Sequence, residues 1–93
     1  MFTTISIHIV NESKFDTAID TFTKNTHLAR KQKGFISRQI LVTPQDGNKI
    51  TTVTNWETKE DIEAWAKNPQ RPKSPPGTYA SVESIVYQDT PVA

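Results

Sequence analysis

Residues 35–56, FISRQILVTPQDGNKITTVTNW, decide the fold. Both ends of this stretch are rich in β-branched residues, which strands favour, and its middle carries Asp46-Gly47, a strong two-residue turn signal. The pattern predicts strands at 35–43 and 49–56, joined as a hairpin. Because apolar side chains occur on both parities of the first strand, the sequence leaves open which side of the sheet Arg38 faces.

A helical pattern precedes the hairpin, over residues 12–33. Apolar or small side chains recur there at alternating steps of four and three, which places them on one helical face: Phe15, Ile19, Phe22, Thr26 and Ala29. Ser13 and Asp16 have the spacing of a capping box at the start of this helix. Gly34 supplies the left-handed residue that commonly ends a helix.

A second helical pattern follows the hairpin. Thr58 is its expected N-cap, with Asp61 three residues later. Ile62, Trp65 and Ala66 form its apolar stripe. This stripe is short, so the sequence predicts a short helix that packs on a neighbouring layer.

Two further strands are expected toward the ends of the chain. Residues 3–10, TTISIHIV, alternate in polarity, and residues 78–88 form the last strand. Residues 70–77 are expected to cross the surface as an extended Pro-rich strap, because prolines continue neither a helix nor a central strand. Residues 89–93 are expected to be a flexible tail.

The element order β-α-β-β-α-β predicts a ferredoxin-like α+β fold, in which a four-stranded antiparallel sheet carries two helices on one face. We expect the helices to cover the face that carries Ile5, Ile7 and Ile9. The opposite face then carries a mixed set of side chains: Thr4, Ser6, His8, Thr52, Thr54 and Trp56. This set is too apolar to remain wet and too polar for a dry core. It predicts a homodimer packed through that face, with a partly polar cavity.

Length and composition limit the classes of function. The 93 residues fit a single domain, 1–93. Eleven basic and ten acidic residues leave a net charge of +1, which gives no electrostatic basis for binding nucleic acid or an anionic membrane. The lack of cysteine excludes disulfides and thiolate sites, and the two histidines have no carboxylates at ligand spacing, so no metal site is expected. The N-terminal residues have no signal-peptide pattern, so a cytoplasmic location is expected.

The stretch 34–70 resembles the antibiotic biosynthesis monooxygenase (ABM) family of the dimeric α/β-barrel superfamily. Gly34, Phe35 and Ser37 match its GF-S element, and the block WETKEDIEAW at 56–65 matches its second-helix pattern. The resemblance implies the same fold and a dimer. The resemblance does not select one activity for this chain, because the superfamily includes cofactor-free quinone-forming monooxygenases, haem-degrading enzymes and proteins of unassigned role.

This chain departs from the enzymes of the superfamily at positions that carry their chemistry. Quinone-forming members have an Asn and a Tyr near the Trp and an Arg beyond the second helix. Here Thr52 and Ile62 stand at the first two places, and Arg71 is the nearest basic residue. Haem-degrading members have an Asn on the first strand and an axial His after the second helix. Here Ser6 takes the first place and residues 66–80 contain no histidine, so no cofactor is expected.

The candidate site follows from the mixed face of the sheet. His8 is the candidate catalytic residue, because an imidazole that titrates near ~6.5 can accept a proton from a phenolic substrate. Ser6, Thr54 and Trp56 are the candidate binding residues, and the indole offers a stacking face, as similar tryptophans of the family do. Arg38 either pairs with a carboxylate or enters the cavity and binds substrate there.

Three functions remain open from the sequence. The first is a cofactor-independent monooxygenase of ABM type that acts on a small hydrophobic aromatic or quinol-like molecule. The second is a dimeric binding or sensing module that uses the same cavity without chemistry. The third is a haem-binding or haem-degrading variant.

Overall fold

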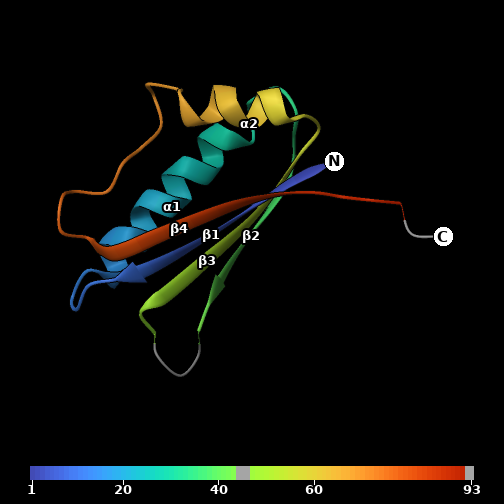
Figure 1. Ribbon diagram of the computed structural model, residues 1–93. Coiled ribbons are helices and arrows are strands. Elements are labelled where there is room, and N and C mark those ends of the chain that lie inside the picture. The colour runs from blue at the N-terminus through green and yellow to red at the C-terminus, as the bar shows by residue number, and fades with distance from the viewer. Residues whose placement is uncertain (44–46, 92–93) are drawn as a thin grey trace.

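The computed structural model describes residues 1–43 and 47–91. Its elements follow the expected order: β1 (Phe2–Val10), α1 (Phe15–Ala29), β2 (Phe35–Val42), β3 (Lys49–Trp56), α2 (Lys59–Ala66) and β4 (Tyr79–Gln88). The strands form one antiparallel sheet in the order β2-β3-β1-β4, and both helices lie on the same side of it (Figure 1). The predicted ferredoxin-like fold is therefore confirmed. The expected Asp46 turn position and the last two residues of the tail lie outside the described residues.

Helix α1 is shorter than expected, and the predicted capping box at its start is wrong. The backbone N–H of Lys14 donates to the Asn11 carbonyl at 3.1 Å, closing a tight turn before the helix. This turn places Ser13 at a φ of 66°, and Lys14 becomes an N-cap without a side-chain hydrogen bond. Gly34 has the expected positive φ, 84°, but it ends the loop that follows the helix rather than the helix itself.

Helix α2 begins as predicted. The side chain of Thr58 accepts a hydrogen bond from the backbone N–H of Asp61 at 3.1 Å, and its hydroxyl donates to the Asp61 carboxylate at 2.8 Å. Asp61 is buried, and a Cβ on Gly34 would overlap its carboxylate. The α1–β2 loop and the first turn of α2 therefore meet at a point where only glycine fits.

The helices cover the opposite face of the sheet from the one expected. Ile50 and Trp56 of β3 are fully buried beneath the helices, and β1 places His8 opposite Ile50 on that same face. Ile5, Ile7 and Ile9 therefore lie on the open face. The prediction failed because it followed the polarity of β1 alone, whose more apolar parity is Ile5, Ile7 and Ile9. The large side chains that decide the choice lie on the neighbouring strand.

Two separate clusters form the core between helices and sheet. One lies toward the Ile50 end of β3 and contains Val10, Ala18, Phe22 and Ile50, and the other lies toward its Trp56 end and contains Ala29, Trp56 and Trp65. The β1 and β3 positions between these ends carry small polar side chains: Thr4, Ser6, Thr52 and Thr54. The layer between helices and sheet is thus apolar at both ends and polar in its middle.

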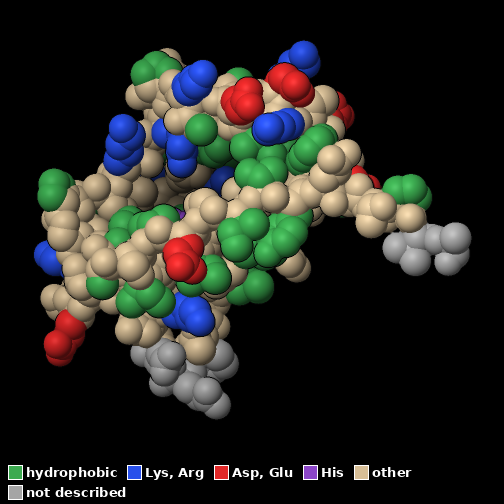
Figure 2. All heavy atoms as spheres, viewed as in Figure 1, with side chains coloured by type: hydrophobic (Ala, Val, Ile, Leu, Met, Phe, Trp, Pro, Cys, Tyr) green, Lys and Arg blue, Asp and Glu red, His purple; other side chains and the backbone are tan. Residues whose placement is uncertain are grey.

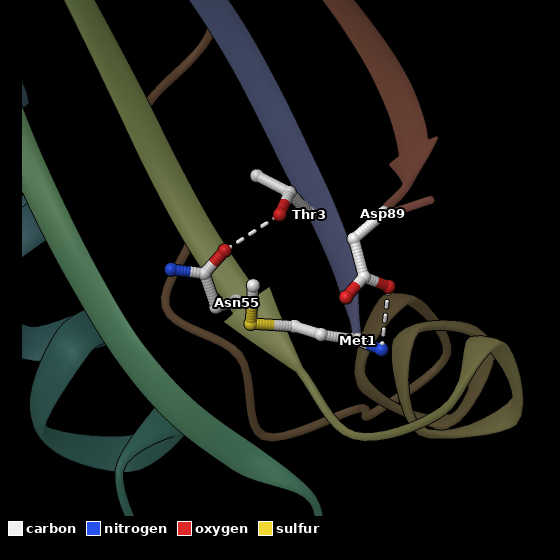
Figure 3. Close-up of polar contacts among 4 residues, drawn as sticks. All are labelled: Met1, Thr3, Asn55 and Asp89. Carbon is white, nitrogen blue, oxygen red and sulfur yellow. Dashed lines mark hydrogen bonds and ion pairs between the residues drawn. The ribbon is translucent and has the colours of Figure 1, made fainter. Parts of the chain in front are cut away.

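The two chain ends are held together beside the open face. The N-terminal ammonium of Met1 lies 2.8 Å from the Asp89 carboxylate, and Thr3 donates to the Asn55 side chain at 2.6 Å (Figure 3). The hydrogen bond from the ammonium holds the pKa of Asp89 below its ordinary value. These contacts fix the outer end of β1 against both of its neighbours. Neither helix of the described chain is long and apolar enough to cross a membrane.

Candidate functional site

A cavity of about 500 Å³ occupies the polar middle of the layer between sheet and helices. Its floor comes from all four strands, its roof from α1 and α2, and one side from the segment after α2. The hollow opens between the helices and β4, with Lys and Arg side chains around it (Figure 2). Val82 and Val86 line this opening and are about half exposed, so a ligand can enter along β4.

All five residues proposed from the sequence line this one cavity: Ser6, His8, Arg38, Thr54 and Trp56. The antiparallel register explains the grouping, because alternate positions of β1 and β3 share a face. A bulge between Phe35 and Ser37 in β2 then places Arg38 opposite Thr54, on that same face. The cavity therefore gathers side chains from three neighbouring strands.

His8 is held between two aromatic rings. Its ring centroid lies 4.8 Å from that of Phe22 in an edge-to-face arrangement and 5.0 Å from that of Tyr79. Burial lowers the pKa of His8 below its ordinary value of 6.5, and the charge of Arg38 lowers it further, although the backbone of Ile50 acts in the opposite direction. The imidazole is therefore neutral at neutral pH, which is the form that accepts a proton.

Arg38 enters the cavity and bonds only to neutral groups. Its Nε donates to Thr54 at 2.9 Å, and its Nη1 donates to Asn25 at 2.7 Å and to Thr26 at 3.2 Å. Burial lowers the pKa of Arg38 to about 10, and the nearby charge of Arg71 contributes. Of the two alternatives left by the sequence, the structure shows the cavity position and no carboxylate among the hydrogen-bond partners of Arg38.

Trp56 belongs mainly to the core. Only 1% of its surface is exposed, and its ring packs edge-on against Phe35 and tilted against Trp65, with centroids 5.7 Å and 6.2 Å away. The ring thus reaches the cavity wall but leaves a ligand little of its face for stacking. The apolar surfaces nearer the opening are those of Val82 and Val86.

The proline-rich segment between α2 and β4 forms one wall of the cavity through Arg71, Pro72, Lys73 and Ser74. The hydroxyls of Ser74 and Tyr79 are 2.8 Å apart, which joins this segment to the start of β4. The guanidinium of Arg71 lies over the Trp65 ring, 5.0 Å from its centroid, and its Nη1 donates to the Ala66 carbonyl at 3.3 Å. The segment is therefore attached to α2 at one end and to the start of β4 at the other, and Figure 1 shows it running between these two elements.

Asn25 and Tyr79 are among the cavity residues that sequence reasoning missed. Asn25 lies on the buried face of α1 with Ala18 and Phe22, and its steps of seven and three from them could have shown this. Tyr79 reaches the helix side only because the β1–β4 register shifts between Ile9 and Val10. Such a shift cannot be found by counting alternate residues along β4.

Unpaired polar atoms concentrate around this cavity. In the described part of the chain, three buried side-chain atoms have no hydrogen-bond partner: Thr4 Oγ1, His8 Nδ1 and Arg71 Nε. All three belong to residues that line the cavity. Buried polar atoms are almost always paired, so this clustering indicates a place where a ligand or ordered water completes the structure. Within residues 1–43 and 47–91, no group of three His, Asp or Glu side chains is placed to hold a metal ion.

The fold and the cavity beneath its helices define a small α+β domain of ABM type. The sequence model of the family described as antibiotic biosynthesis monooxygenase matches residues 2–73, and the chain belongs to this family. No curated protein sequence matches the chain.

Solved structures share the fold at low sequence identity. A Nitrosomonas europaea protein assigned to the same family superposes with a TM-score of 0.86 at 16% identity, covering 96% of this chain and 98% of that chain. SnoaB, a cofactor-independent oxygenase from Streptomyces nogalater, gives 0.79 at 12% identity, covering 98% and 94%. A mutant of MhuD, crystallised with two manganese protoporphyrin IX molecules per active site, gives 0.76 at 17% identity, covering 100% and 98%. At these identities the comparison shows a common fold.

Proposed function

We propose that this protein is a cofactor-independent monooxygenase that oxidises a small aromatic or quinol-like molecule in the cavity beneath its helices. The observation that carries the proposal is the position of His8 in the cavity, partly buried between the rings of Phe22 and Tyr79 with an unpaired Nδ1. Family membership and the fold shared with SnoaB support the reaction type. Ser6, Thr54, Trp56 and Arg38 are the proposed binding residues.

In this proposal His8 is the general base. A phenol or an activated C–H group of the substrate gives its proton to the imidazole, and the resulting carbanion-like substrate supplies the electrons that reduce oxygen. One oxygen atom then replaces two hydrogens of a CH₂ group to form a carbonyl, and the other oxygen atom leaves as water. Arg38 and the hydroxyl of Thr54 stabilise the negative charge that develops on the substrate oxygen.

The active unit in this proposal is a homodimer. The open face of the sheet carries a row of aliphatic side chains with no cover from the same chain: Ile5, Ile7, Ile9, Val53 and Ile85. Patches of this kind on small proteins commonly mark interfaces, and a specific interface buries about 800 Å² per partner. A second copy packed against this face leaves the cavity intact, because the helices and the open face lie on opposite sides of the sheet.

Oxygen uptake tests the enzymatic proposal. A panel of dihydroxy-aromatics and anthrone-like compounds is added to the wild-type protein and to His8→Ala, with tryptophan fluorescence as a parallel measure of binding. We expect uptake with at least one compound, and a loss of roughly 10²–10⁴-fold in rate for His8→Ala. His27→Ala, which changes the exposed histidine of α1, is the matched control and should retain the rate.

The same experiment distinguishes the remaining functions. Fluorescence quenching without oxygen uptake across the panel contradicts the oxygenase proposal and supports a binding or sensing module. A Soret band that appears on adding haemin, in the absence of any response to the panel, supports the haem-binding variant instead.

A further inference from the structure

The charges around the cavity are all of one sign. Its lining includes the cationic side chains of Arg38, Arg71 and Lys73, together with the neutral His8, and no Asp or Glu from residues 1–43 or 47–91 lies in it. The two ion pairs within the described residues, Met1–Asp89 and Lys24–Asp20, involve neither arginine. Partly buried charges are normally paired, because removing an ion from water has a large free-energy cost.

Arg38 is fixed in position without being neutralised. Its Nε and Nη1 donate to hydroxyl and amide oxygens from β3 and α1, and these acceptors carry no charge. Within the described chain its Nη2 forms no hydrogen bond. The three hydrogen bonds of Arg38 are explained if this residue connects α1 to the sheet. That structural role does not explain why a second guanidinium, that of Arg71, lines the same cavity.

Arg71 is the second cation, and it comes from a different part of the chain. Its guanidinium lies on the Trp65 ring, and its Nε is buried without a partner. Each arginine is thus held by neutral contacts, and the two are near enough for the charge of Arg71 to lower the pKa of Arg38. Two guanidinium groups that repel each other in a cavity without carboxylates favour an anion between them.

We propose that the ligand of this cavity carries a carboxylate that binds between Arg38 and Arg71, with its aromatic part along the apolar wall. The planar fork of a guanidinium matches a carboxylate in geometry, and charge-assisted hydrogen bonds are about twice as strong as neutral ones. A phosphate monoester is also an anion, but it carries about −1.5 to −2 charges at pH 7 and has a tetrahedral geometry. This inference rests on the proposed function in that both place a small aromatic molecule in the cavity, and it narrows that molecule to an aromatic acid.

Calorimetric titration with naphthoate and naphthamide, which have nearly the same shape and differ in charge, tests the proposal. Wild-type protein should bind naphthoate roughly ten- to a hundredfold more tightly than naphthamide. Arg38→Gln and Arg71→Gln should each remove most of this preference, because the carboxylate loses a charged partner in each variant. Arg30→Gln, which removes an exposed arginine just after α1, is the matched control and should keep the preference. Circular dichroism checks that each variant is folded, and Arg71→Gln carries the test if Arg38→Gln does not fold.

Each outcome decides one of the two proposals. Equal affinities for naphthoate and naphthamide, or an unchanged preference in Arg71→Gln, contradict the carboxylate site even if oxygen uptake is observed with neutral compounds. A clear preference for naphthoate without uptake of oxygen by any compound supports the carboxylate site and contradicts the oxygenase. Tighter binding of naphthyl phosphate than of naphthoate replaces the carboxylate by a phosphate and overturns the proposal as stated. Binding of none of the three contradicts the carboxylate site, whereas the oxygenase is contradicted only by the lack of oxygen uptake across its own panel.

Discussion

The position of His8 beneath the helices sets the protonation of its imidazole, because burial lowers its pKa. Because burial lowers the pKa of His8 in the folded protein, the unfolded chain binds more protons than the folded chain as the pH falls below 6.5. The free energy of unfolding therefore decreases as the pH falls from the unfolded pKa toward the lower, folded pKa. Above the pKa that His8 has in the unfolded chain, its full contribution to the free energy of unfolding is present.

This sign gives a prediction for the stability of the protein. Between about pH 8 and about pH 5, the melting temperature of the wild type should decrease more steeply than that of His8→Asn, which has no titrating group at this position. His27→Asn should follow the wild-type curve, because His27 is exposed on α1. Parallel curves for the wild type and His8→Asn would show that His8 is not buried as described.

At the residue scale, the sequence suggested the wrong role for Trp56 and left the direction of Arg38 open. The sequence indicated a stacking surface at Trp56, but its ring is enclosed by Phe35 and Trp65. The sequence left the direction of Arg38 undecided, and a single bulge in β2 directed it into the cavity. Alternation along a strand predicts neither the depth at which a side chain lies nor a shift in register.

At the scale of elements, the contact between the α1–β2 loop and α2 depends on Gly34. A Cβ at this position would overlap the Asp61 carboxylate, whereas a Cβ on Gly77 would meet no heavy atom within 4 Å. Both glycines have nearly the same positive φ, 84° and 86°. Comparing the two positions therefore separates steric overlap from backbone strain.

Gly34→Ala should destabilise the protein more than Gly77→Ala does. Each substitution carries a backbone cost of about 1–2 kcal/mol, and overpacking against Asp61 adds about 1–3 kcal/mol at position 34 only. Urea unfolding at a fixed protein concentration measures both values. Equal losses would contradict the close approach of loop and helix.

The cap of α2 gives a second prediction at this scale. Thr58→Ala removes the acceptor for the Asp61 N–H and should lower the free energy of unfolding by about 1 kcal/mol. The matched control is Thr23→Ala in the exposed middle of α1, where the hydroxyl only bonds back to the Ile19 carbonyl. Alanine is the better helix former there, so this control should be neutral or slightly stabilising. A loss of the same size in both variants would contradict the capping role.

At the scale of the whole molecule, the open face of the sheet predicts self-association. Ile85 lies on this face and is 51% exposed. Light scattering of the wild type should give a mass near twice the 10.5 kDa of one chain. Ile85→Glu places a charge in the proposed interface and should shift the mass to that of a monomer. Gln70→Glu, which adds the same charge at an exposed position after α2, should remain a dimer. A monomeric wild type would contradict the proposed assembly.

Local patterns in the sequence were sufficient for the element order, the fold class and the N-cap of α2. Each of these depends on residues close together in the chain, such as the strand periods and the spacing of Thr58 and Asp61. Periodicity also grouped Ser6, His8, Thr54 and Trp56 on one face, because alternate residues of paired strands share a side.

Only the tertiary structure decided what covers that face. The alternation of β1 alone favoured the Ile5, Ile7 and Ile9 parity as the covered side, but Ile50 and Trp56 of β3 are buried under the helices and decide the opposite side. The same packing brought Asn25 of α1 to Arg38, and the bulge at Ile9 brought Tyr79 to His8. These contacts join segments far apart in the chain. Periodicity can assign a side chain to a face, but the packing of distant elements determines whether that face becomes a core, a cavity or a bare surface.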